Sequence, residues 1–213
     1  MFAYCLNNPS NMVDPTGQCC MFRSLRIYDC GSASCPDSSA YMDTSGTTPG
    51  TTMGYTINGQ EKLPYADKRI GIGSYGTSGC GLIAVYNAMQ LIGQVVSLQD
   101  VTNELIDDML LYGAGGLNPF ALDDYFTSHG ISFTSLYSKS ALKRNVKEGS
   151  VFVFVVMNNK NNLFDGFHMM AGQYVNGKYR IYNRFNTSTS YSEYATFNEG
   201  FEEGVWVYGV LLG

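Results

Sequence analysis

Apolar residues recur at helical spacing between Leu82 and Ile92, and this pattern predicts a helix with one buried side. The pair Thr77-Ser78 is placed to cap the start of this helix. Gly93 suits the position just after its end, where a left-handed residue often closes a helix.

Two further helices are predicted from their caps. One begins at Ser97, has an acidic residue three positions later, and runs to about Leu111. The next takes Asn118 as its cap, has Pro119 in its first turn, and ends at His129-Gly130.

The later part of the chain is dominated by strand patterns. The continuous apolar run Val151–Met157 is typical of a central strand that is covered on both faces. Asn176-Gly177 separates the segments Gly166–Val175 and Lys178–Asn183, which predicts a hairpin with a two-residue turn. Val205–Leu212 is the final predicted strand. A strand over residues 131–137 and a short helix over Lys139–Lys147 complete the set. Helices followed by an antiparallel sheet indicate an α+β fold.

Composition divides the 213-residue chain into parts. Residues 31–60 are dominated by Gly, Ser, Thr and Pro without a periodic apolar pattern, so we expect a flexible linker over residues 18–62. The composition becomes globular from Leu63, which places the expected domain at residues 63–213. The net charge is −5 and Lys and Arg do not cluster, so nucleic acid is not an expected partner. No apolar run approaches the length of a membrane span, and the N-terminus lacks a signal-peptide pattern.

Six cysteines are unevenly distributed along the chain. Cys80 is the only one in the expected domain, so it has no disulfide partner there. The other five are Cys5, Cys19, Cys20, Cys30 and Cys35. Their spacing fits no good zinc motif, and we expect neither a metal nor an organic cofactor. Whether these five pair with one another stays open.

The N-terminal residues resemble a known family. Phe2–Pro9 (FAYCLNNP) followed by Val13–Gly17 (VDPTG) is similar to the motif that closes the core of RHS/YD-repeat proteins. In that family the motif precedes a variable C-terminal payload, which is often a toxin. The resemblance implies that residues 1–17 end an RHS core, and that the chain is the tail of a larger secreted or cell-surface polypeptide.

Candidate chemistry begins at Cys80, which stands between two glycines at the expected start of a helix. Unpaired N–H groups and the helix dipole favour negative charge there, so they would lower the pKa of the thiol. The backbone N–H of Cys80 can also stabilise a developing oxyanion. A small buried residue in a tight turn is the alternative interpretation.

The register of the predicted hairpin supplies a base for this thiol. With a two-residue turn at Asn176-Gly177, His168 and Asn183 lie on one face as diagonal neighbours, about 7–8 Å apart. The Asn183 side-chain amide is expected to accept a hydrogen bond from the imidazole and to hold the ring toward Cys80. The only other histidine, His129, falls in the last turn of a helix, where we expect a capping role.

Gly76–Gly81 together with Gly166–Gly172 and Tyr182-Asn183 resembles the active-site segments of papain-like cysteine peptidases, in particular those that remove double-glycine leaders from bacteriocins. The resemblance covers about residues 68–213 and implies a papain-like fold with Cys80, His168 and Asn183 as a triad. The family usually places a glutamine shortly before the cysteine as an oxyanion donor, but residues 70–79 contain none. Ser74, Tyr75 and the Cys80 amide are the candidates that remain.

The two resemblances together imply a cysteine peptidase toxin that is carried by an RHS shell and acts on a protein or peptide in a target cell. An immunity protein would be a further partner. A deamidase or transglutaminase with the same triad and a binding module without activity stay open as alternatives. A nuclease payload is disfavoured by the acidic charge and by the lack of clustered His and carboxylate residues.

Overall fold

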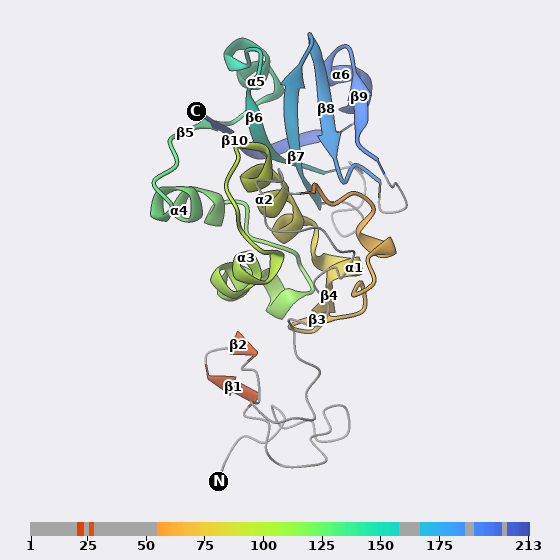
Figure 1. Cartoon of the computed structure of the whole chain (residues 1–213), viewed down its shortest axis with the longest axis vertical. Helices are drawn as coiled ribbons and strands as arrows, with labels where there is room; N and C mark the ends of the chain where they lie inside the picture. The colour runs from red at the N-terminus through yellow and green to blue at the C-terminus, as the bar shows by residue number, and fades with distance from the viewer. Residues whose placement is uncertain (1–20, 24–25, 28–54, 158–166, 186–189, 202–203) are drawn as a thin grey trace, which may run out of the picture. The chain divides into compact units, whose positions relative to one another are not determined.

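A computed structural model of the chain describes residues 21–23, 26–27, 55–157, 167–185, 190–201 and 204–213 (Figure 1). The chain divides into two compact units, Met1–Gly50 and Thr51–Gly213. Within the first unit, β1 (Met21–Arg23) pairs antiparallel with β2 (Arg26–Ile27). The RHS-like motif at residues 1–17, the five early cysteines and the expected linker up to residue 54, apart from β1 and β2, lie outside the described residues.

The second unit contains a six-stranded antiparallel sheet in the order β5-β10-β6-β7-β8-β9. Its strands are β5 (Phe133–Leu136), β6 (Val151–Met157), β7 (Phe167–Val175), β8 (Lys178–Tyr182), β9 (Ser192–Tyr194) and β10 (Val205–Leu212). A separate two-stranded sheet joins β3 (Arg69–Ile70) and β4 (Gly73–Ser74). The predicted α+β class and the central position of β6 are both confirmed.

The helices of the second unit are α1 (Tyr75–Ser78), α2 (Cys80–Leu91), α3 (Leu98–Leu105), α4 (Ala121–Ser128), α5 (Lys139–Asn145) and α6 (Phe197–Phe201). Short 3-10 turns accompany them in the described part of the unit, namely η3 (Gln60–Lys62), η4 (Ile106–Asp108) and η5 (Leu110–Gly113). The sequence pattern did not predict β3, β4, β9, α6 or these turns, because each is too short to show a periodic pattern.

Several helix boundaries differ from the prediction. The helix expected to take Asn118 as its cap begins at Ala121 with Phe120 as its N-cap, and α5 ends at Asn145 instead of Lys147. The cap before the cysteine is Ser74, whose side chain pairs with Thr77 around the start of α1, and Gly79 joins α1 to α2. The next helix ends at Leu105 instead of near Leu111. Two acidic residues follow at Asp107 and Asp108, where negative charge opposes the dipole at the C-terminal end of a helix.

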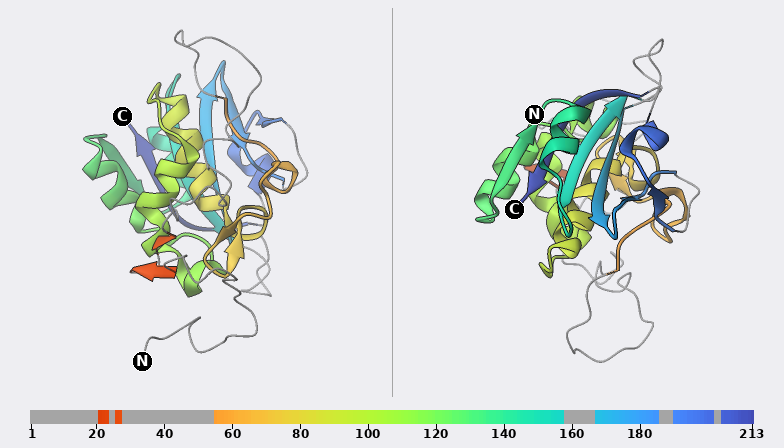
Figure 2. Two further views of the ribbon diagram at one scale, coloured as in Figure 1. Left: turned by 60° about the horizontal axis from the view of Figure 1, so that its bottom comes forward. Right: turned by 90° about the horizontal axis from the view of Figure 1, so that it is seen from above.

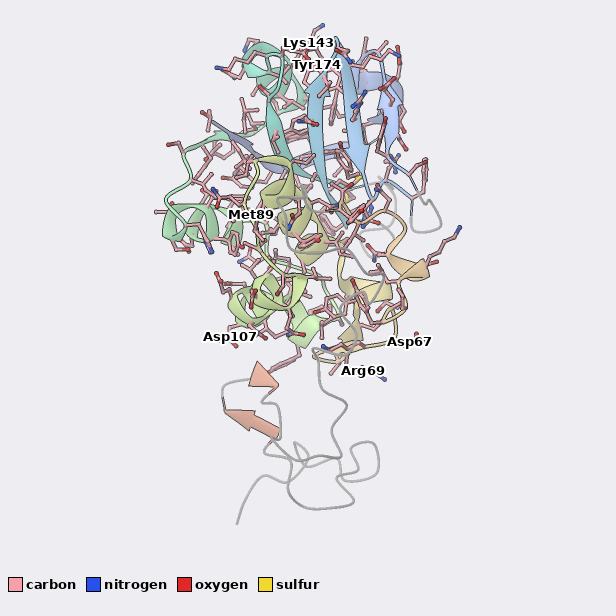
Figure 3. The ribbon with its side chains drawn as sticks, viewed as in Figure 1. Asp67, Arg69, Met89, Asp107, Lys143 and Tyr174 are labelled. Atoms are coloured by element: carbon pink, nitrogen blue, oxygen red, sulfur yellow. The ribbon has the colours of Figure 1, made fainter. Side chains whose placement is uncertain are left out.

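The sheet is covered on both faces, as the apolar run of β6 predicts. Alternate residues of β6 point to opposite sides: Val153 joins the core beneath α2, α3 and α4, and Phe154 joins the core with α5 and α6. Figure 2 shows α2 lying along the sheet, and Figure 3 labels Met89, one of its buried side chains. Because α2 packs against β7, its N-terminal residue Cys80 is fixed relative to that strand.

The hairpin between β7 and β8 has the predicted turn and register. Asn176 and Gly177 both have positive φ, as a type I′ turn requires. Ala171 pairs with Tyr182 and Val175 pairs with Lys178, which is the register of a two-residue turn. The β7 strand is therefore set against β8 as the sequence predicts.

The domain begins earlier than the predicted boundary at Leu63. Asn87 of α2 accepts a hydrogen bond from the Ile57 N–H (2.6 Å) and donates one to the Ile57 carbonyl (2.8 Å). Gln60 is buried, with 2% of its surface exposed. Residues 55–60, which we name the strap, are thus part of the domain, although the Gly, Ser, Thr and Pro content of residues 31–60 as a whole led to their assignment to the linker.

Candidate active site

The backbone positions Cys80 as the first residue of α2, with Gly79 as the N-cap. Gly81 is required there because a Cβ on it would lie 2.4 Å from the Cβ of Leu117. Cys80 is a free cysteine, and the residue as a whole is half-buried. The nucleophile candidate therefore lies at a helix start, as predicted, where backbone N–H groups lack helical partners.

His168 lies near the start of β7, opposite Val156 of β6, and its imidazole shares a hydrogen bond with the Cys80 thiol. The Nε2 atom of the ring is 2.6 Å from the backbone carbonyl oxygen of Asn183. A carbonyl only accepts, so Nε2 carries a hydrogen, which leaves Nδ1 to take the thiol proton. The structure thus brings the sulfur of Cys80 and this imidazole together.

Charge and hydrogen bonding shift both groups toward an ion pair. Burial alone would raise the pKa of the Cys80 thiol, but the hydrogen bond and charge of His168, together with backbone N–H groups of Met169 and Gly81, lower this pKa overall. Burial lowers the pKa of His168, yet its interactions with Cys80 and the Asn183 carbonyl outweigh burial and raise this pKa. The positive charge of Arg184 opposes that rise. Both shifts act in the direction that favours a thiolate beside an imidazolium.

Asn183 lies beside the imidazole as predicted, but its backbone carbonyl contacts the ring instead of its side-chain amide. Its side chain does not bind the ring: Oδ1 accepts the N–H groups of Gly59 and Gln60, both at 3.1 Å, and Nδ2 donates to Gln60 Oε1 at 2.8 Å. The backbone conformation explains this difference, since β8 ends at Tyr182 and Asn183 has a φ of 56°. This left-handed turn ends the alternation on which the prediction rested, and it presents the carbonyl to His168 instead.

Two of the three oxyanion candidates are occupied elsewhere. The Tyr75 hydroxyl is buried and hydrogen-bonds Thr102 Oγ1 at 2.6 Å. The Ser74 side chain forms the capping box of α1 with Thr77. The Cys80 backbone N–H is the candidate that remains, at the helix start where the dipole also favours negative charge.

Gln60 and Asn58 are the residues near the site that sequence reasoning missed. Gln60 Nε2 donates to the Gly76 carbonyl of α1 at 2.9 Å, and the Asn183 N–H donates to Asn58 Oδ1 at 2.9 Å. Both residues lie in the strap, whose composition indicates a loop and whose spacing matches no motif. Only the three-dimensional contact with Asn183 reveals them.

His129 is placed as predicted, at the C-terminal end of α4. Its Nδ1 contacts the Tyr125 carbonyl at 2.9 Å, its ring stacks on Tyr125, and its Nε2 lies 3.3 Å from Glu104. It takes no part in the cysteine site.

Comparison with protein-family models finds no match for this chain, and comparison with curated proteins finds none either. Among the described residues, no group of three or more His, Cys, Asp or Glu side chains is placed to hold a metal ion. No helix in the described ranges is long and apolar enough to cross a membrane.

Proposed function

We propose that residues 55–213 form a papain-like cysteine hydrolase domain that cleaves amide bonds in a protein or peptide. The single observation that carries this proposal is the hydrogen bond between the Cys80 thiol at a helix start and the His168 imidazole, with the ring held by Asn183 from its far side. The helix-then-sheet order and the resemblance of the segments around Cys80 and His168 to papain-like peptidases support the same assignment.

In the proposed reaction, His168 holds the Cys80 proton and the thiolate attacks the carbonyl carbon of an amide. Negative charge develops on the carbonyl oxygen near the Cys80 N–H. His168 then protonates the leaving amine, and the C–N bond breaks to give a thioester and a free amine. Water adds to the thioester with His168 as the base, which releases a carboxylic acid and restores the thiol.

The biological setting in this proposal comes from the N-terminal resemblance. An RHS shell would carry the domain as a toxin payload out of the producing cell, and the domain would act inside a target cell on a protein substrate. An immunity protein would protect the producer. Expression of the domain in a susceptible cell should arrest growth, and Cys80→Ala should relieve the arrest. Equal toxicity of the two forms would remove the thiol from the mechanism.

Mass spectrometry of a proteome treated with the purified chain distinguishes the proposed peptidase from other enzymes that use the same triad. New peptide termini that depend on Cys80 are the expected result. A mass increase of about one unit on Gln or Asn residues would indicate a deamidase, and cross-linked or amine-modified Gln would indicate a transglutaminase. Untreated and Cys80→Ala samples provide the two controls.

A further inference from the structure

The strap reaches both halves of the candidate site through a single side chain. Gln60 donates from Nε2 to the Gly76 carbonyl, four residues before Cys80, and accepts at Oε1 from Asn183 Nδ2. One bond uses a hydrogen on the amide nitrogen, and the other uses the amide oxygen. The Gln60 side chain that forms them is almost fully buried. In Figure 1 the orange segment that contains η3 lies beside α1.

Asn183 is held in its left-handed conformation from several sides at once. Its side-chain oxygen accepts from Gly59 and Gln60, its Nδ2 donates to Gln60, and its own N–H donates to Asn58. Only 1% of its surface is exposed. These contacts fix the conformation of Asn183 and so determine where its carbonyl points.

The carbonyl that is fixed in this way is the group that contacts His168 Nε2 at 2.6 Å. The strap itself is anchored to α2, since Asn87 bonds both the N–H and the carbonyl of Ile57. The helix that carries the thiol and the turn that holds the imidazole are therefore joined through one short segment that precedes both in the sequence.

We propose that Gln60 is a positioning residue of the active site, which aligns the His168 imidazole with the Cys80 thiol by holding the Asn183 backbone carbonyl. This inference rests on the proposed function, and it assigns the third role of the triad to a main-chain group supported by the strap. Asn58 assists from the other side of Asn183. Neither residue touches the reacting atoms.

The chain offers a direct test, because it contains only two histidines. With ¹⁵N-labelled histidine, NMR follows the ring nitrogens of His168 while His129 serves as an internal reference. In wild type, His168 should remain an imidazolium well above the pH at which an ordinary histidine loses its proton. Gln60→Met keeps the buried volume but removes both bonds, so His168 should titrate at lower pH than in wild type.

The second readout is the rate of Cys80 alkylation by iodoacetamide at pH 6. A rise of one unit in the pKa of the thiol reduces the thiolate fraction about tenfold, and we expect a loss of about this size in Gln60→Met. The matched control is Gln90→Met, since Gln90 is also buried and donates to the Val96 carbonyl at 2.8 Å, near the other end of α2. The control should melt at lower temperature without this change in alkylation.

Asn58→Ala is a milder variant if Gln60→Met does not fold, because Asn58 is only half-buried and loses one bond to Asn183. It should shift both readouts in the same direction by a smaller amount. Wild-type behaviour of folded Gln60→Met or Asn58→Ala in both readouts, or an equal shift in Gln90→Met, would overturn the role of Gln60. An ordinary His168 titration in wild type would instead overturn the hydrolase proposal itself.

Discussion

The chemistry of this protein depends on one thiol and one imidazole whose surroundings oppose the effect of burial. Buried thiols ordinarily keep their proton and buried imidazoles lose theirs. Here the hydrogen bond and opposite charges of Cys80 and His168 reverse both tendencies. The sign of the pH response follows, because a lowered thiol pKa preserves the thiolate as the pH falls, and a raised imidazole pKa preserves the imidazolium as the pH rises.

Wild-type Cys80 should therefore react with iodoacetamide at mildly acidic pH, where an ordinary cysteine is protonated and slow. His168→Ala removes the largest factors that lower the pKa of the thiol, and burial then raises it. Alkylation at pH 6 should fall by tenfold or more, and the rate profile should move to higher pH. The measurement is the rate of label incorporation at Cys80 between pH 5 and 10, read by peptide mass spectrometry.

His129→Ala is the matched control for this experiment. It removes a ring of the same size that stacks on Tyr125 and bonds the end of α4. Loss of this capping interaction should reduce stability by about 0.5–2 kcal/mol without moving the alkylation profile. A His168→Ala profile that overlays that of His129→Ala would contradict the ion pair.

Sequence predicts the identity of the site residues better than it predicts which of their atoms act. Cys80 and His168 follow from a helix start and a hairpin register, both of which are local properties. The side-chain role expected of Asn183 fails because the left-handed turn at the end of β8 has no signal that separates it from a continuing strand. Gln60 is missed since its importance arises from partners that lie 16 and 123 residues away.

At the scale of elements, α2 is the part that fixes the nucleophile against the sheet. Its two ends use glycine for different reasons: Gly81 makes room for Leu117, whereas Gly93 has a φ of 79° and a Cβ added to it would meet nothing within 4 Å. Three elements were predictable from local patterns. The helix has a repeating apolar pattern, the hairpin has an Asn-Gly turn, and β6 is a continuous apolar run. The early end of α3 was not, because apolar residues continue past Leu105 as far as Leu111.

Substitutions at the two glycines of α2 should separate placement of the thiol from stability. Gly81→Ala should displace the start of the helix from Leu117, reduce the free energy of unfolding by about 1–3 kcal/mol, and slow the alkylation of Cys80. Gly93→Ala should cost about 1–2 kcal/mol through its left-handed backbone alone and leave alkylation unchanged. Chemical denaturation and the labelling rate measure the two effects, and slowed labelling in Gly93→Ala would contradict this division.

For the molecule as a whole, the boundary of the domain decides whether the site is complete. Composition places this boundary at Leu63, but hydrogen bonds place the strap inside the domain. A boundary drawn from composition counts residue types and takes no account of the hydrogen bonds that the residues form. It therefore assigns to the linker a segment whose Asn and Gln side chains bond α1 and Asn183, and whose backbone bonds α2.

A chain that begins at Leu63 should be less stable than one that begins at Thr51, the first residue of the second compact unit. Without the strap, the buried side chains of Asn87 and Asn183 lose their partners, and each such loss costs about 1–3 kcal/mol. In a domain of this size, the melting temperature should fall by at least about 5 °C. Thermal unfolding of the two chains is the measurement, and equal melting temperatures would show that the strap is dispensable.

The use of a main-chain carbonyl at position 183 changes what a relative of this protein must conserve. Every amino acid carries that oxygen, so selection would act on the ability to adopt positive φ, which Gly, Asn and Asp share. A divergent relative with Gly at this position keeps the carbonyl but loses the side-chain bonds to the strap. Such a relative would need other contacts to hold the turn, and a search for an acidic or amide third residue would discard it as inactive. In such sequences, the residues at positions 60 and 183 would be expected to covary.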